Sequence, residues 1–223
     1  MTEFTLNDNT WLWPTPAGAY YAVQQSDPEK PRALIQKLLT LDQAPHVDTQ
    51  TIAETWPEFE LDDCLELLYR MQTLKYLTAR DEAISAPQGI VEDMVSEAIQ
   101  ALSMDGKALL ADNQGFHIAT CGFPHETAGE LAALAAQLGE VYQRRRGVLH
   151  RNLGLDTAAM ALVDASGFSQ LGFWPMFIGK TCFYLVIEGF PKLNQEHFTH
   201  LVWMLSRRYG TGPGQDDNAP EGT

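Results

Sequence analysis

The chain has 223 residues and a formal net charge of -14, from 29 acidic and 15 basic residues. Hydrophobic residues make up 45% of it, which is typical of a soluble globular protein able to bury a core. The acidic balance argues against non-specific attraction to nucleic acid or to an anionic membrane. The three cysteines are widely spaced, which argues against a disulfide scaffold and favours reduced thiols. With no signal-peptide pattern and no apolar run long enough for a bilayer, we expect a cytoplasmic protein without membrane insertion.

Residues 1–29 are predicted to form an N-terminal extension. Its segment 11–25, WLWPTPAGAYYAVQQ, is rich in tryptophan and tyrosine around a proline-rich corner, which predicts an aromatic strand or hairpin. Buried aromatic rings usually supply packing area, so packing onto a domain is the simplest role of this segment. An exposed aromatic patch for a partner is the alternative.

Residues 30–84 are predicted to form a small helical domain. Apolar residues at helical spacing indicate a helix in 32–41, a short helix capped by Asp48 or Thr49, and a longer helix in 57–74. The segment KYLTAR, which follows, has the pattern of a strand. Three helices leading into a strand resemble a winged helix-turn-helix module, for which DNA is the obvious partner.

The charges of this segment argue against DNA. Residues 30–82 carry six basic and ten acidic residues, and carboxylates crowd the start of the last helix, where a recognition helix needs basic or amide side chains. A solvated face or a protein contact fits these carboxylates better. The candidate partner-binding residues here are Glu60, Asp62, Asp63 and Glu66.

The segment 84–89, ISAPQG, is the best linker candidate, because proline and glycine interrupt both periodic patterns. From residue 90 the predicted order is helix, two strands, helix, three strands and helix, which ends near Gly210. Residues 211–223 contain almost no apolar residues and are predicted to be a disordered tail.

Three motifs lie in this second half. Asp112-Asn113-Gln114-Gly115 is a D-x-x-G corner between two strands, and Ala119-Thr120-Cys121-Gly122 follows on the second strand. The alanine-rich segment 126–135, ETAGELAALA, then opens a long helix. With the order of the elements, these motifs make residues 90–210 resemble the roadblock/LC7 family.

The resemblance implies a mixed α/β (α+β) fold with a five-stranded antiparallel sheet flanked by helices. It further implies homodimers that extend the sheet and pair helices across a two-fold axis, and a role without catalytic residues. Roadblock proteins act as dimeric platforms, and bacterial and archaeal members are often tied to small Ras-like GTPases. The segment GFWPMFIGKTCF is bulkier and more aromatic than is usual in the family.

Two further surfaces are candidates for partner binding. The dense basic segment RRRGVLHR either complements the negative end of the long helix or docks onto an acidic surface of this chain, of its dimer mate or of another partner. In FWPMF, bulky residues fall on both faces of a strand, and the proline indicates an edge strand or a bulge. The candidate residues are Arg144, Arg145, Arg146, Arg151, Trp174 and Met176.

The motifs of enzymes are missing or incomplete. On one strand, His117 and Cys121 would lie roughly 13 Å apart, at about 3.3 Å per residue, too far to share one zinc ion. The GKT of residues 179–181 lacks the earlier glycine of a phosphate loop and leads into a strand rather than a helix, so it fits a turn better. We therefore expect no catalytic residues, no metal and no cofactor.

The sequence accordingly predicts a non-catalytic, dimeric protein-interaction platform that regulates or localises a small Ras-like GTPase or assembles a multiprotein complex. The alternative is a transcriptional regulator that binds DNA through the winged helix and dimerises or senses a signal through the second domain. A small-molecule sensor in the second domain is a third possibility.

Overall fold

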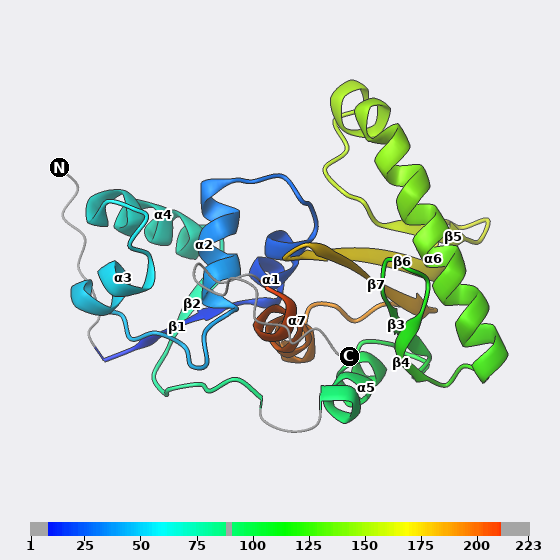
Figure 1. Ribbon diagram of the computed structural model, residues 1–223, viewed down its shortest axis with the longest axis horizontal. Coiled ribbons are helices and arrows are strands. Elements are labelled where there is room, and N and C mark those ends of the chain that lie inside the picture. The colour runs from blue at the N-terminus through cyan, green and yellow to red at the C-terminus, as the bar shows by residue number, and fades with distance from the viewer. Residues whose placement is uncertain (1–8, 88–90, 211–223) are drawn as a thin grey trace, which may run out of the picture.

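A computed structural model describes residues 9–87 and 91–210. The elements in chain order are β1 (Trp11–Pro14), α1 (Pro16–Val23), α2 (Lys30–Leu38), α3 (Thr49–Thr55), α4 (Leu61–Thr73), β2 (Leu77–Arg80), α5 (Val91–Ala101), β3 (Ala108–Ala111), β4 (His117–Cys121), α6 (His125–Arg146), the π-helical turn η1 (Gly147–Asn152), β5 (Met160–Val163), β6 (Ser169–Ile178), β7 (Thr181–Glu188) and α7 (Glu196–Tyr209). Figure 1 shows α2–α4, β1 and β2 at one side of the molecule, the sheet with α6 at the other, and α1 and α7 between them.

The aromatic segment 11–25 is a short strand followed by a helix, so the prediction of a strand or hairpin over its whole length was wrong. The cause is a strong helix start. The Thr15 side chain accepts a hydrogen bond of 3.1 Å from the Gly18 amide, and Pro16 occupies the first turn, where a missing N–H costs nothing. The strand β1 pairs antiparallel with β2, far along the chain, with Leu12 opposite Ala79.

Three helices and a strand follow as predicted, in α2, α3, α4 and β2. Asp48 is the N-cap of α3, and its side chain accepts a hydrogen bond of 2.8 Å from the Thr51 amide. The strand β2 finds its partner in β1, which precedes the three helices. The assignment of residues 30–84 as a winged helix stays a prediction.

Stability at acid pH is expected to depend on this cap. The backbone hydrogen bond from Thr51, then the bonds from the Thr51 hydroxyl and His46, lower the pKa of Asp48 from 3.8 to about 2. Because the pKa is depressed in the folded protein, the stabilisation is complete above the ordinary pKa and is lost as the pH falls through about 2. A carbon-detected NMR titration is expected to place the Asp48 midpoint near the lower value. Asp48→Asn keeps the cap and removes the titration, whereas a wild-type midpoint near 3.8 would contradict the cap geometry.

The second half forms a five-stranded antiparallel sheet in the order β4-β3-β7-β6-β5, as predicted. Two tight corners join its hairpins in the same way. In each, an aspartate Oδ1 accepts from the amides two and four residues later, and a glycine takes a positive φ, +87° at Gly115 and +84° at Gly167. The sequence had singled out the Asp112 corner, and the Asp164 corner repeats it. The GKT segment is a turn between β6 and β7, also as predicted.

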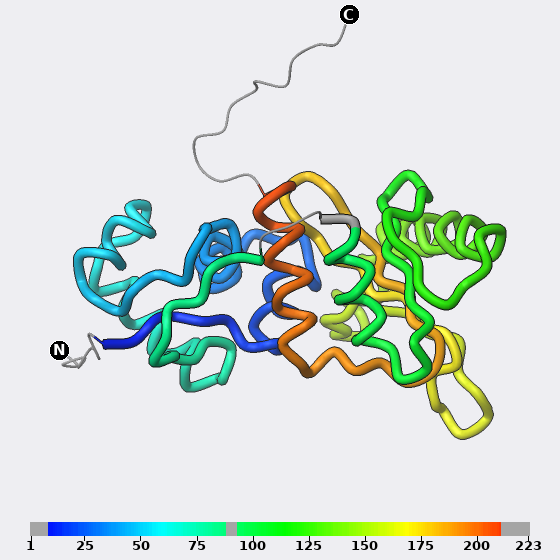
Figure 2. The backbone as a smooth tube through the Cα atoms, turned by 90° about the horizontal axis from the view of Figure 1, so that it is seen from below, coloured from blue at the N-terminus to red at the C-terminus, as the bar shows by residue number. Residues whose placement is uncertain are grey.

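Helices cover both faces of the sheet. Apolar residues of α5 and α7 pack on one face, against inward residues of β3, β6 and β7. The other face packs against α6 through a stripe of small residues, which is completed by Tyr142. Figure 2 shows α5 and α7 side by side with the sheet between them and α6. The stripe consists of Ala128, Ala132, Ala135 and Gly139.

One hydrophobic core joins the N-terminal elements to the sheet. Trp203 of α7 is 2% exposed, meets the Trp13 ring with centroids 5.0 Å apart, and donates from its indole nitrogen to the Leu41 carbonyl at 2.8 Å. Ion pairs from both ends of α7, Arg80–Glu196 and Asp42–Arg207, reach the same N-terminal half.

The predicted linker 84–89 lies partly within the described residues. The Ala44 amide donates to the Ile84 carbonyl, and the Ala86 amide donates to the Asp42 carbonyl, so the start of this segment is tied to the N-terminal half. The predicted disordered tail 211–223 lies outside the described residues, as do residues 88–89 of the linker. The division into domains remains a prediction.

Candidate functional site

The four arginines of the basic segment do not form one surface. Arg144 and Arg145 are exposed on the last turn of α6, on different sides of the helix. Arg146 forms an ion pair with Asp27 in the loop between α1 and α2. Arg151 lies in η1, where it lines a cavity of about 250 Å³ that also includes Asp27. One arginine of the segment therefore docks onto an acidic residue of the N-terminal extension of this same chain, and three remain at the surface.

The acidic residues lie together at the start of α4. All four are exposed, with Glu60 at the N-cap and the other three in the first turns of the helix. Within the described part of the chain their side chains make no ion pair. Carboxylates at this end stabilise the positive end of the helix dipole. They also leave an acidic face where a DNA-reading helix would need cations.

Residues Trp174 and Met176 lie on the side of β6 that faces α1, α5 and α7. Met176 is fully buried in the core, and Trp174 is half-buried against it, so packing accounts for both residues in this structure. The strand β6 lies between β5 and β7, but β5 pairs with it only as far as Phe173. Pro175 therefore lies where β6 has a strand on one side only, which explains how a residue without an N–H is accommodated.

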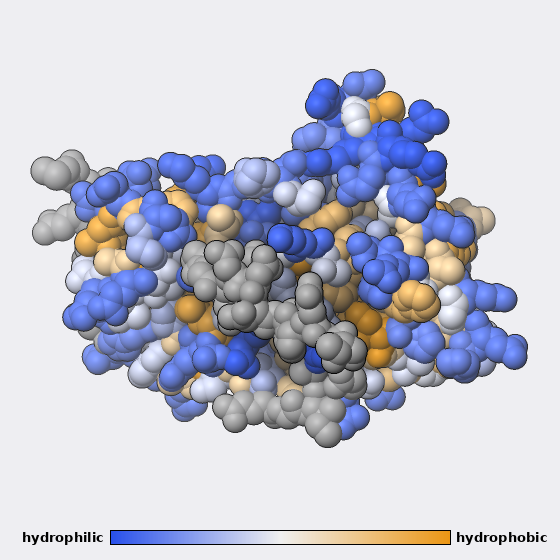
Figure 3. Space-filling model, in the orientation of Figure 1, coloured by the Kyte–Doolittle hydropathy of each residue, from blue (hydrophilic) through white to orange (hydrophobic). Residues whose placement is uncertain are grey.

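A second apolar stripe on α6 is only partly covered by the residues that the structure describes. Leu131 and Leu138 pack partly against the sheet-side core, whereas Leu134 and Val141 are 37% and 44% exposed. These four positions follow a spacing of three and four residues, which places them on one flank of the helix, roughly 100° from the small-residue stripe. Val148, in η1 just beyond α6, is 49% exposed and extends the apolar surface. Hydrophobic patches interrupt the hydrophilic surface along α6 in Figure 3.

The edge strand β5 is open in the same region. No strand within residues 9–87 and 91–210 pairs with its outer side, and Leu162 and Val163 are 60% and 57% exposed. Leu162 lies opposite Leu171, which packs on the α6 side of the sheet, so Leu162 faces the same side as α6. An open strand edge with unpaired backbone groups thus accompanies the apolar stripe of α6.

Together the stripe and the edge form what we term the α6–β5 surface. It consists of Leu131, Leu134, Leu138, Val141, Val148, Leu162 and Val163. None of these residues was among the predicted partner-binding residues, because the alanines of α6 dominate the local pattern. Counting a three-and-four spacing of large aliphatic residues along 131–148 would have found it.

His117 and Cys121 lie on β4, and His125 is the first residue of α6. The rings of His117 and His125 meet edge to face with centroids 5.3 Å apart, and the Cys121 thiol donates to the Ser96 carbonyl at 3.2 Å. Burial raises the pKa of the Cys121 thiol, which disfavours the reactive thiolate. Within residues 9–87 and 91–210 no group of three or more His, Cys, Asp or Glu side chains is placed to hold a metal ion. In the same ranges no helix is long and apolar enough to cross a membrane.

No protein-family model matches this sequence, and the comparison with curated proteins finds no match. Solved structures give partial likenesses. A roadblock/LC7 domain from Streptomyces avermitilis is 17% identical, with 51% of this chain and 92% of that chain covered and a TM-score of 0.36. The gliding protein MglB from Thermus thermophilus is 18% identical, with 56% and 94% covered and a TM-score of 0.36. MglB from Myxococcus xanthus is 12% identical, with 56% and 94% covered and a TM-score of 0.35. The proposed function therefore rests on the sequence motifs and on the geometry of the chain itself.

Proposed function

We propose that this protein is a homodimeric interaction platform that dimerises through the α6–β5 surface. The dimer offers a composite binding surface to a small Ras-like GTPase or to the components of a larger complex. The observation that supports dimerisation is the open edge of β5 beside the apolar stripe of α6. The proposal of a GTPase as the partner is based on the resemblance of residues 90–210 to the roadblock/LC7 family.

The geometry of the surface suits a two-fold axis. Two copies of β5 can pair antiparallel, which satisfies the edge backbone groups of both strands and continues one sheet into the next. Because α6 and Leu162 lie on the same face of the sheet, the same symmetry brings the two α6 stripes together above the joined strands. Exposed aliphatic side chains on both elements are then buried at once, and their burial is the main source of stability in such an interface.

The charge of the chain favours a protein partner over nucleic acid. The net charge is -14, and the start of α4 presents exposed carboxylates. Three arginines at and just beyond the end of α6 remain available at the surface. Arginine forms planar, paired hydrogen bonds with carboxylates, so these residues suit contacts with a partner protein. A platform of this kind needs no reactive group of its own.

The test measures the mass of the protein in solution and the nucleotide dependence of GTPase binding. Light scattering of the purified protein at micromolar concentration is expected to give twice the 24.8 kDa of one chain. Small Ras-like GTPases of the source organism, each loaded with GDP or with a non-hydrolysable GTP analogue, are then tested for binding and for hydrolysis with and without the protein. Binding that depends on the nucleotide supports the platform. A monomer that binds no GTPase but binds duplex DNA in a salt-dependent way would replace this proposal with the regulator alternative.

A further inference from the structure

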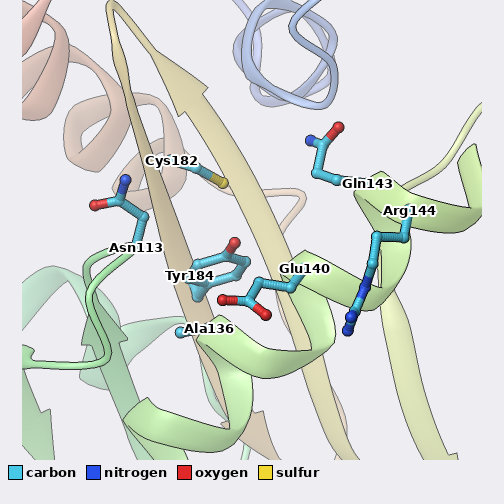
Figure 4. A pocket seen from close by; sticks show the side chains of 8 residues that line it. Asn113, Ala136, Glu140, Gln143, Arg144, Cys182 and Tyr184 are labelled. Atoms are coloured by element: carbon cyan, nitrogen blue, oxygen red, sulfur yellow. The ribbon is translucent and has the colours of Figure 1, made fainter.

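A polar cleft lies beside α6, on the flank away from the α6–β5 surface. Its volume is about 490 Å³, and it is bordered by α6, by the start of β7 and by the corner between β3 and β4 (Figure 4). Its volume falls within the roughly 300 to 1,000 Å³ of small-molecule pockets, and it opens widely to solvent. Ala136, Gly139 and Gln143 project from the flank of α6 opposite Leu134, so the centre of the cleft stays clear of the proposed dimer interface. Arg144 lies at the rim of the cleft, three residues from Val141.

The floor of the cleft is formed where α6 packs closely on β7. A Cβ atom at Gly139 would lie 1.8 Å from the Tyr184 hydroxyl, so glycine is required for the ring to lie under the helix. With Ala136 as the preceding residue of the floor, two consecutive turns of α6 carry almost no side chain there. The Tyr184 ring is buried in the sheet-side core, and its hydroxyl reaches the cleft.

The walls carry hydrogen-bonding groups of every type. Glu140, Gln143 and Arg144 come from α6, and Asn113 comes from the opposite corner. In the part of the chain that the structure describes, the side chains of these four residues make no hydrogen bond and no ion pair. Glu140 and Arg144 have the spacing at which helical residues of opposite charge often pair, yet they remain apart. In Figure 4 the Glu140 carboxylate points toward Tyr184, and the Arg144 guanidinium lies apart from it at the side of the cleft.

The two groups at the floor are neutral donors. Burial raises the pKa of the Cys182 thiol to about 11, and burial, followed by the neighbouring Cys182 and Glu140, raises the pKa of the Tyr184 hydroxyl. Both groups therefore keep their protons at neutral pH. The formal charge of the lining is then one carboxylate and one guanidinium, which cancel each other.

From this geometry we propose that the cleft binds a small zwitterion, a free amino acid or a dipeptide. The ammonium group of the ligand lies at Glu140 and its carboxylate at Arg144, where the guanidinium forms paired hydrogen bonds. Asn113, Gln143 and the Tyr184 hydroxyl supply neutral donors and acceptors for the rest of the ligand. A singly charged ligand would leave one of the two wall charges without a partner, so it binds more weakly than a zwitterion.

The probe set consists of the free protein amino acids and simple dipeptides, with acetate and methylammonium as singly charged controls. Each is titrated at millimolar concentration into the full-length protein and followed by amide NMR, and affinities are measured by calorimetry. At least one zwitterion is expected to shift the amide signals of Asn113 and Tyr184. Glu140→Gln and Arg144→Met are each expected to weaken its binding by about tenfold or more, because each removes a charge-assisted hydrogen bond.

Glu130→Gln is the matched control, since it removes an exposed carboxylate from α6 outside the cleft and is expected to leave binding unchanged. The proposal is overturned if no zwitterion binds, if the singly charged controls bind as tightly, or if neither cleft variant changes the affinity. Light scattering measures the mass of the protein on the same samples, so it reports the dimer independently of ligand binding. Failure of the ligand proposal therefore leaves the proposed function standing.

Discussion

Val141→Asp is expected to convert the dimer into a monomer. Val141 is 44% exposed in the single chain, so a carboxylate there remains solvated in the monomer and leaves its fold intact. In the proposed dimer the same carboxylate would be buried against an apolar stripe, and an uncompensated buried charge costs about 3–5 kcal/mol. The exposed Arg145, four residues further along the helix, offsets only a few tenths of a kcal/mol of that cost. The dissociation constant is thus expected to rise by roughly two to four orders of magnitude. Sedimentation at several concentrations measures this change.

Two further variants make the result specific. Ala133→Asp places the same charge on an exposed position of α6 that is not three or four residues from any member of the stripe, and it is expected to leave the dimer unchanged. Leu162→Lys places a charge on the open edge of β5 and is expected to weaken the dimer, since lysine at an edge opposes strand pairing. If Val141→Asp and Leu162→Lys both remain dimeric, the interface lies elsewhere on the molecule. If the wild type is itself a monomer, the α6–β5 surface needs a different occupant.

The elements that local pattern predicted well are those whose cause is local. The turn at GKT and the cap at Asp48 depend on residues close together in sequence. The five-stranded sheet, in which β3 pairs with the distant β7, was instead implied by the resemblance to the roadblock/LC7 family. Segment 11–25 was misjudged because tryptophan and tyrosine favour strands, while a threonine cap and Pro16 start a helix. The pairing of β1 with β2 joins Trp11 to Arg80, and no local pattern contains that information.

The candidate sites show the same division. Consecutive residues on a helix point about 100° apart, so three successive arginines at the end of α6 cannot all lie on one face. Arg146 is fixed by Asp27, a residue more than a hundred positions earlier, which only the folded chain brings near. The cleft depends on the contact of Gly139 with Tyr184, which is likewise invisible in the sequence. The acidic face of α4 was predictable because its carboxylates share one helix end.

Trp203→Ala is expected to destabilise the protein by about 3–5 kcal/mol, the range for removing a large buried side chain. Trp203 is 2% exposed, and its loss leaves a cavity beside Trp13 and leaves the Leu41 carbonyl without its donor. Trp203→Phe retains much of the packing and loses the hydrogen bond, so a smaller loss of about 1–2 kcal/mol is expected. Urea unfolding followed by far-ultraviolet circular dichroism measures both values.

The region that Trp203→Ala destabilises shows whether the two halves of the chain unfold together. Trp203 belongs to α7, which packs on the sheet, yet its ring and its indole nitrogen contact the N-terminal half. If one core holds both halves, hydrogen exchange in Trp203→Ala accelerates in α4 and in β3 together, because unfolding of either half exposes the other. Protection that persists in α4 while β3 loses it would mean that residues 30–84 fold on their own. The continuous core favours the first outcome, and a platform built that way carries its N-terminal half as a rigid part of the surface it presents.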